Sequence, residues 1–324
     1  MNYPRYLHTA SVLTNGKVLV TGGWNDGVSL DNAELYDPST GVWNITNNMN
    51  YPRNLYTASV LANGKVLVTG GWNHGIFSNR SELYDPLTGM WNVTNNMNYP
   101  RWYHTASVLT NGKVLVIGGW NDGVSLDNAE LYDPSTEMWN ITKNMNYPRY
   151  HHTASVLTNG KVLVTGGDNT GVLDSVELYD PSTEVWNIIN NMNYARGYHT
   201  ASILTNGKVL VTGGLNNGVS LDSAELYDPS TGTWNVTNNM NYPRYFHTAS
   251  VLTNGKVLVT GGLNGGVSLD SAELYDPSTG VWNVINNMNY ARGYHTASVL
   301  TNGKVLVIGG YASGSLNSTE LYQP

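Results

Sequence analysis

The chain has 324 residues, with 16 Lys or Arg against 23 Asp or Glu and a formal net charge of −7. The basic residues recur at regular intervals and form no patch or stripe, which excludes a nucleic-acid partner of the usual kind. The absence of cysteine excludes disulfides, thiolate nucleophiles and cysteine-containing metal sites.

Targeting signals are sparse. No apolar run approaches the ~20 residues that a membrane-spanning helix needs, so we expect no membrane insertion. Met1 lies inside a repeated pattern, so we expect no export signal in this chain. Asn-X-Ser/Thr sequons would be glycosylated only in a secreted eukaryotic protein, and the compartment stays open. These sequons begin at Asn44, Asn79, Asn92, Asn140, Asn235 and Asn317.

One segment, LTNGKVLVTGG at residues 13–23, occurs seven times along the chain with few changes. A repeat this regular predicts a repeat architecture in which each unit is one supersecondary element. We expect a single domain over residues 1–324. Its units are 1–48, 49–96, 97–144, 145–191, 192–239, 240–287 and 288–324.

Within the first unit, residues 8–13 and 17–23 are rich in strand-forming residues and flank Asn15-Gly16, which favours a tight hairpin. After a variable segment, residues 33–36 and 42–46 flank a turn that contains Pro and Gly. Gly, Pro or Asn-Gly interrupts every window of helix length. The sequence therefore predicts an all-β fold with four antiparallel strands per unit.

Small four-stranded sheets that repeat many times favour radial blades, because each sheet buries its faces only against its neighbours. The paired glycines Gly22-Gly23, then Tyr36, then Trp43 after six further residues resemble the kelch repeat, and the resemblance covers the whole chain in seven copies. It implies a seven-bladed β-propeller. In that architecture the first strand of each blade lines a central channel and the fourth is outermost.

The seventh unit departs from the pattern. It reaches Glu320-Leu321-Tyr322 without a Trp-bearing fourth strand, and nothing ahead of Met1 supplies one. We expect a monomeric closed ring whose last blade lacks its outermost strand and leaves an exposed edge. The alternatives are a piece of a longer array, or a partner chain that supplies the strand.

Positions that are the same in every unit are expected to hold the blades together. Arg5 and Glu34 should pair as partly buried charges, and their counterparts should do the same. Tyr36 and Trp43 should pack between blades. A histidine recurs at one position, and we expect it to be hydrogen-bonded at the start of strand one, because no mixed ligand set supports a metal site. The set is His8, His104, His152, His199, His247 and His295, with Tyr56 in the second unit.

Catalytic signals are weak. Galactose-oxidase-like enzymes share the kelch propeller and carry a copper site with a Cys-crosslinked Tyr, and that cofactor cannot form without cysteine. No carboxylate pair stands out against the repeated background. We therefore expect no catalytic residue, no metal, no cofactor and no enzymatic activity.

Variation falls in two loops, which the kelch architecture places on one rim of the channel. A rigid scaffold that presents variable loops is a common form of binding face. We expect a rim that binds a protein or peptide, over an aromatic arc in blades seven to three. The alternatives are a glycan, because aromatic faces stack on sugars while amides and carboxylates bond hydroxyls, or a structural array without a ligand. The rim candidates are Trp24, Trp72, Trp120, Asp168 and Tyr311 in one loop, and Tyr6, Trp102, Tyr150, His151 and Tyr245 in the other.

Overall fold

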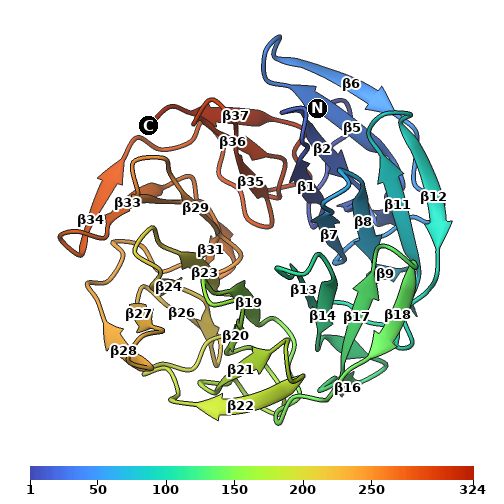
Figure 1. Cartoon of the computed structure of the whole chain (residues 1–324). Helices are drawn as coiled ribbons and strands as arrows, with labels where there is room; N and C mark the ends of the chain where they lie inside the picture. The colour runs from blue at the N-terminus through green and yellow to red at the C-terminus, as the bar shows by residue number, and fades with distance from the viewer.

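The computed structural model describes all of residues 1–324 and contains 37 β-strands. The larger sheets stand around a central channel as the blades of a propeller (Figure 1). Six of these sheets have four strands and the last has three. This confirms the predicted all-β, seven-bladed propeller and its three-stranded last blade. No helix of the length and apolarity needed to cross a membrane is present.

The two inner strands of each blade form the hairpin that the Asn-Gly turn predicts. The first lines the channel, and the second is fully buried, which explains its unbroken apolar run Val-Leu-Val. The first strands are β1 (Thr9–Val12), β7 (Thr57–Val60), β13 (Thr105–Val108), β19 (Thr153–Val156), β23 (Thr200–Ile203), β29 (Thr248–Val251) and β35 (Thr296–Val299). The second strands are β2 (Val18–Thr21), β8 (Val66–Thr69), β14 (Val114–Ile117), β20 (Val162–Thr165), β24 (Val209–Thr212), β30 (Val257–Thr260) and β36 (Val305–Ile308).

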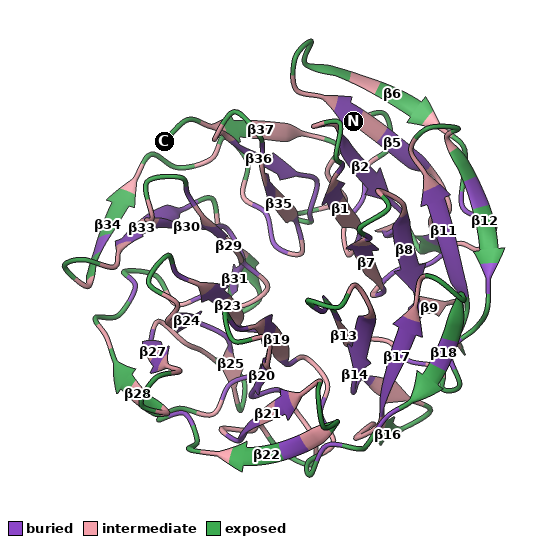
Figure 2. Cartoon of the chain, in the orientation of Figure 1, coloured by how far each residue is buried: buried purple, intermediate pink, exposed green.

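The two outer strands carry the Tyr and Trp of the repeat. Exposed residues gather on the outermost strands (Figure 2). The third strands are β5 (Ala33–Asp37), β11 (Ser81–Asp85), β17 (Ala129–Asp133), β21 (Val176–Asp180), β27 (Ala224–Asp228), β33 (Ala272–Asp276) and β37 (Thr319–Tyr322). The fourth strands are β6 (Val42–Thr46), β12 (Met90–Thr94), β18 (Met138–Ile141), β22 (Val185–Ile189), β28 (Thr233–Val236) and β34 (Val281–Ile285).

Five blades add a small hairpin in the variable loop between their second and third strands, which the sequence analysis did not predict. Blades four and seven have a shorter loop and form only single bridges, Asp168 to Val172 and Tyr311 to Ser315. The small hairpins pair β3 (Trp24–Asn25) with β4 (Val28–Ser29), β9 (Trp72–Asn73) with β10 (Ile76–Phe77), β15 (Trp120–Asn121) with β16 (Val124–Ser125), β25 (Leu215–Asn216) with β26 (Val219–Ser220), and β31 (Leu263–Asn264) with β32 (Val267–Ser268).

The hydrophobic core lies between adjacent blades rather than within one. At the closure of the ring, Val18 and Val20 of blade one pack with Leu306 and Ile308 of blade seven, and Trp43 packs against the same cluster. Tyr36 is buried, with its ring 5.0 Å from that of Trp43. Burial of apolar surface between blades one and seven therefore closes the ring across the whole length of the chain.

Buried ion pairs recur in every blade, which confirms the predicted pairing of Arg and Glu. The Arg Nη2 lies 2.6–3.1 Å from a Glu Oε1, and the pairs stay buried except for the Glu of blade seven. The Arg also donates from Nη1 to two backbone carbonyls, as Arg149 does to Gly166 and Ser175. The pairs are Arg5–Glu34, Arg53–Glu82, Arg101–Glu130, Arg149–Glu177, Arg196–Glu225, Arg244–Glu273 and Arg292–Glu320.

Candidate ligand-binding rim

The two variable loops of each blade are tied together at one end of the channel. The Tyr6 amide donates to the Trp24 carbonyl at 3.2 Å, and the Trp24 amide donates back at 2.8 Å. The equivalent bridge occurs in all seven blades. Gly23 makes this approach possible, since it adopts φ 97° and a Cβ there would lie 2.7 Å from the Tyr6 carbonyl oxygen. The paired glycines thus place both loops on the same rim.

A closed circle of backbone hydrogen bonds surrounds the mouth of the channel at this rim. Each of seven residues donates its amide to the carbonyl of its counterpart in the preceding blade at 3.0–3.4 Å, and Leu7 closes the circle onto Tyr294. All seven have φ between 50° and 56°, which non-glycine residues rarely adopt. We call these residues the mouth ring: Leu7, Leu55, Tyr103, His151, Tyr198, Phe246 and Tyr294.

The side chains of the mouth ring pack on one another. The ring centroid of His151 lies 4.0 Å from that of Tyr103 and 3.6 Å from that of Tyr198. Phe246 lies 4.3 Å from Tyr198 and 4.2 Å from Tyr294. Of these seven residues only His151 was predicted as a rim residue, although an apolar or aromatic residue directly before the repeated His or Tyr marks the whole ring.

An apolar cavity of about 390 Å³ opens over blades one to three. Trp24 and Trp72 lie 5.2 Å apart between ring centroids, and Trp72 stacks on Trp102 at 6.2 Å. Phe77 packs on Trp102 at 5.7 Å. The volume falls in the range of small-ligand sites. We call this the tryptophan cavity, and its lining is Tyr6, Leu7, Trp24, Asn54, Leu55, Trp72, Phe77 and Trp102.

Other rim candidates extend the aromatic surface on both sides of the tryptophan cavity. Tyr311 of blade seven lies 5.1 Å from Tyr6 and is 37% exposed. Trp120 packs against Tyr150 at 4.8 Å. Tyr245 stands apart on blade six, near Tyr198 of the mouth ring. Ring contacts thus join Tyr311 to Tyr6 and link Trp24, Trp72 and Trp102, whereas Trp120 contacts Tyr150 of blade four. That these groups form one binding arc stays a prediction.

His151 and Asp168 form a polar pair within this aromatic surface. His151 Nδ1 lies 2.9 Å from Asp168 Oδ2, and the His151 side chain is only 5% exposed. Burial lowers the pKa of His151 to about 4, against the opposing effect of Asp168, so the imidazole is neutral at pH 7. Because a carboxylate only accepts, Nδ1 carries the proton and Nε2 is left as a buried acceptor without a partner.

Gly197 makes room for this pair, and sequence analysis missed it. A Cβ at Gly197 would lie 2.5 Å from Asp168 Oδ2. At the Gly197 position the other blades carry larger residues, except for blade seven, which has Gly293. No other blade has Asp at the Asp168 position or His at the His151 position. Three departures from the repeat therefore meet at one point, and their coincidence is the signal that identifies the pair.

The repeated histidines lie deeper in the channel and are structural, as predicted. His8 Nε2 lies 2.9 Å from the Thr296 hydroxyl of the neighbouring blade. Burial lowers the pKa of His199 and of His295 to about 3. In blade two, the Tyr56 hydroxyl takes the place of the imidazole. No group of three or more His, Asp or Glu side chains is placed to hold a metal ion.

Comparison with known proteins supports the repeat assignment. Residues 104–310 match the family model described as the KLHDC2/KLHL20/DRC7 Kelch-repeats domain, and residues 5–50 and 53–98 match the Kelch motif. No curated protein sequence matches the chain. A fungal alcohol oxidase of the AA5 family, solved in complex with copper, has a similar structure with a TM-score of 0.80 and 22% identity, over 98% of this chain and 72% of that one.

The alcohol oxidase corrects one prediction. We predicted that the chain has no enzymatic activity. That prediction is contradicted, because a protein of the same fold is an alcohol oxidase and one fold can host many functions. At 22% identity the likeness shows the fold alone. This chain has no cysteine for the Cys-crosslinked Tyr of such a copper site, and His8 and its counterparts face threonine hydroxyls.

Proposed function

Because the chain belongs to the kelch-repeat family, whose propellers commonly serve as protein-interaction scaffolds, we propose that its tryptophan cavity binds a peptide segment of a protein partner. The anchor of that segment is an aromatic or aliphatic side chain. Seven of the eight lining residues are apolar, and none is charged.

The observation that carries this proposal is the gathering of partly exposed tryptophans around one cavity. Trp24, Trp72 and Trp102 all keep part of their surface in solvent. Burial of apolar surface contributes about 25 cal/mol per Å², and tryptophans dominate the binding energy of many interfaces. Monomeric proteins rarely leave such apolar surface uncovered without a binding role.

The polar groups of the cavity favour a peptide over a glycan. Asn54 is the single polar lining residue and is buried. Its side-chain nitrogen already donates to the Ser29 hydroxyl at 2.9 Å and the Trp72 carbonyl at 3.2 Å. A sugar needs acceptors as well as donors for its hydroxyls, whereas the unpaired polar groups of the lining are mainly indole N–H donors such as Trp102 Nε1.

Selection from a displayed peptide library against the full chain tests the proposal. Selected peptides should share an aromatic or aliphatic anchor, and Trp72→Ala should weaken their binding by about 2 kcal/mol, or about thirtyfold. Leu215→Ala, at the equivalent position of blade five, is the matched control and should change affinity little. Equal losses from both variants, or binding of glycans and not peptides, would reject the proposal.

A further inference from the structure

The carboxylate of Asp168 lies at a position that the other blades fill with an apolar or aromatic side chain. Its counterparts are Trp24, Trp72, Trp120, Leu215, Leu263 and Tyr311. In blade six, Leu263 is buried against Gly293, just as the Asp168 carboxyl group lies against Gly197. The Asp168 side chain is only 17% exposed. A charge in such a place needs a partner.

No cation balances this carboxylate within the chain. Two kinds of repeated carboxylate do have one. Each strand-three Glu pairs with a buried Arg, and the turn Asp of six blades pairs with a surface Lys, as Asp180 does with Lys161. Asp168 instead contacts the imidazole of His151, whose pKa of about 4 makes it neutral at pH 7. The His151–Asp168 pair thus keeps a net negative charge.

The hydrogen bond to His151 leaves one oxygen of Asp168 for a ligand. Oδ2 accepts from His151 Nδ1 at 2.9 Å, whereas Oδ1 has no hydrogen bond within the chain and is not fully buried. A guanidinium group binds a carboxylate best through two parallel hydrogen bonds that use both oxygens. An ammonium group is a compact point charge that needs only one. The geometry therefore favours a primary ammonium group.

Tyrosine side chains beside the pair offer further contacts to an ammonium group. The ring centroids of Tyr150 and Tyr198 lie 4.3 Å and 3.6 Å from that of His151. Burial raises the pKa of Tyr150, and the charge of Asp168 adds to that effect, so the Tyr150 hydroxyl lies within the field of the carboxylate. A phenol oxygen accepts hydrogen bonds, and its ring face attracts a cation.

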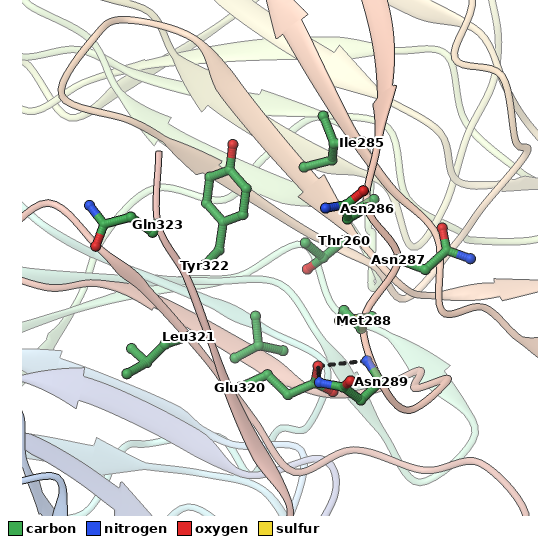
Figure 3. A pocket seen from close by; sticks show the side chains of 12 residues that line it. Thr260, Ile285, Asn286, Asn287, Met288, Asn289, Glu320, Leu321, Tyr322 and Gln323 are labelled. Atoms are coloured by element: carbon green, nitrogen blue, oxygen red, sulfur yellow. Dashed lines mark hydrogen bonds between the residues drawn. The ribbon is translucent and has the colours of Figure 1, made fainter.

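The loop that carries His151 is fixed without a ligand. Glu177 accepts from the backbone and side-chain amides of Asn146 at 2.7 and 2.8 Å. Figure 3 shows the same contact in blade seven, where Glu320 accepts from Asn289. The His151 amide also donates within the mouth ring at 3.4 Å. Because the pair is already ordered, ligand binding loses little conformational entropy.

The surrounding rim loops are acidic. The seven loops between second and third strands contain eight Asp, one Arg and no Lys or Glu. These loops are residues 24–32, 72–80, 120–128, 168–175, 215–223, 263–271 and 311–318. A surface with one sign of charge raises the local concentration of the opposite charge and speeds association. The rim therefore attracts cations towards Asp168.

We propose that the His151–Asp168 pair binds a primary alkylammonium group, with Asp168 Oδ1 as its anionic partner and Tyr150 and Tyr198 beside it. The group is a lysine side chain of the peptide that the tryptophan cavity binds, and in this respect the inference rests on the proposed function.

The tryptophan cavity and this pair are neighbours on the rim. The ring centroid of Tyr103 lies 4.6 Å from that of Trp102 in the cavity lining and 4.0 Å from that of His151. An extended chain covers about 3.3 Å per residue, so a peptide anchored in the cavity reaches Asp168 within a few residues.

Titration of the full chain with n-butylammonium chloride tests the site without a peptide. NMR signals of the His151 imidazole and the Tyr198 ring should shift saturably, whereas uncharged n-butanol should leave them unchanged. Asp168→Asn should weaken n-butylammonium binding about tenfold, as expected for loss of a charge-assisted hydrogen bond. Asp122→Asn removes the same charge from an exposed turn of the rim and should change the affinity by less than about twofold.

Peptides selected against the full chain provide the second measurement. Lys should recur at a fixed spacing from the apolar anchor. Replacing that Lys by norleucine should weaken binding to the native chain about tenfold, and should have little effect on binding to Asp168→Asn. Replacing it by Arg should also weaken binding, because only one carboxylate oxygen is free.

No saturable shift with n-butylammonium, or equal effects of Asp168→Asn and Asp122→Asn, would overturn the site. Binding of n-butylammonium together with peptides that tolerate norleucine would assign the site to a free amine and overturn the lysine assignment. If Trp72→Ala weakens peptide binding and norleucine does not, this inference fails and the proposed function stands. If Trp72→Ala has no effect while n-butylammonium binds through Asp168, the proposed function fails and the ammonium site stands.

Discussion

Replacement of Arg149 by Ala removes the cation at the centre of the buried network in blade four. Arg149 Nη2 lies 2.9 Å from Glu177 Oε1, and both side chains are fully buried. Arg149 Nη1 also donates to the carbonyls of Gly166 at 2.8 Å and Ser175 at 3.0 Å. The substitution therefore leaves one buried carboxylate without its cation and the Gly166 carbonyl without its donor, while the Ser175 carbonyl keeps the Gly166 amide at 3.1 Å.

The loss of stability depends on the environment of the Glu177 carboxylate that remains buried. Breaking a buried ion pair costs about 3–5 kcal/mol, because the remaining charge is buried without its partner. Glu177 keeps the amides of Asn146 at 2.7 Å and Tyr147 at 3.0 Å, and the Asn146 side-chain amide at 2.8 Å. These donors stabilise the lone carboxylate, so we expect a loss near the lower limit, about 3 kcal/mol.

Two variants of the same chain calibrate this value. Arg292→Ala breaks the equivalent pair in blade seven, where the Glu320 side chain is 14% exposed and water can solvate it. We expect about 1–2 kcal/mol there, close to the cost of an unmade hydrogen bond. Lys161→Ala breaks a surface pair with Asp180 at 3.1 Å and should cost less than about 1 kcal/mol.

Urea denaturation of the four proteins measures these differences as changes in the free energy of unfolding, provided that the m-values agree. The expected order of losses is Arg149→Ala, then Arg292→Ala, then Lys161→Ala. A double variant with Leu in place of both Arg149 and Glu177 should recover little of the loss, because the backbone amides of Asn146 and Tyr147 would lose the carboxylate that accepts from them. If Arg149→Ala costs no more than Lys161→Ala, the buried network does not stabilise the blades.

Two further predictions concern acid stability and the polar pair at the channel mouth. Burial lowers the pKa of His199 from 6.5 to about 3, so the unfolded chain binds more protons than the folded chain below pH 6.5. The free energy of unfolding should therefore fall by up to about 1.4 kcal/mol per pH unit for each such histidine as the pH drops towards 3. Urea denaturation curves that coincide at pH 7 and pH 5 would contradict this prediction. Gly197→Ala should displace the Asp168 side chain and lower the free energy of unfolding by about 1–3 kcal/mol. The downfield NMR signal of the His151 Nδ1–H proton should be lost with the hydrogen bond to Asp168. Gly171→Ala is the control and should change neither property, because a Cβ at Gly171 has no atom within 4 Å.

Local chemistry repeated at a fixed period made the fold predictable from the sequence. Asn15-Gly16 favours a turn between two strand-forming runs. The second run, Val18–Thr21, is apolar over its first three residues because both its faces are buried. The pairing of Arg5 with Glu34 was predictable too, since two opposite charges that recur in every blade need partners when they are buried. Each inference depends on one unit and its repetition.

The composition of the rim was also readable, since only two loops vary. The arrangement of the rim side chains could not be predicted, because nearly identical units give no local signal for which side chains of neighbouring blades are in contact. The tryptophan cavity joins Tyr6 and Trp24 to residues of blades two and three. The pair of His151 and Asp168 depends on Gly197 of the next blade, whose missing side chain leaves the space.

Closure of the ring is likewise a tertiary property. The Arg5 amide donates to the Leu316 carbonyl at 3.0 Å, and the Gly310 amide donates to the Arg5 carbonyl at 2.9 Å. These contacts join residues about 300 positions apart. A sequence pattern fixes the strands and turns of each blade through short-range sterics and burial. The angle between successive blades accumulates around the ring, so only the packing of all seven decides that the last meets the first.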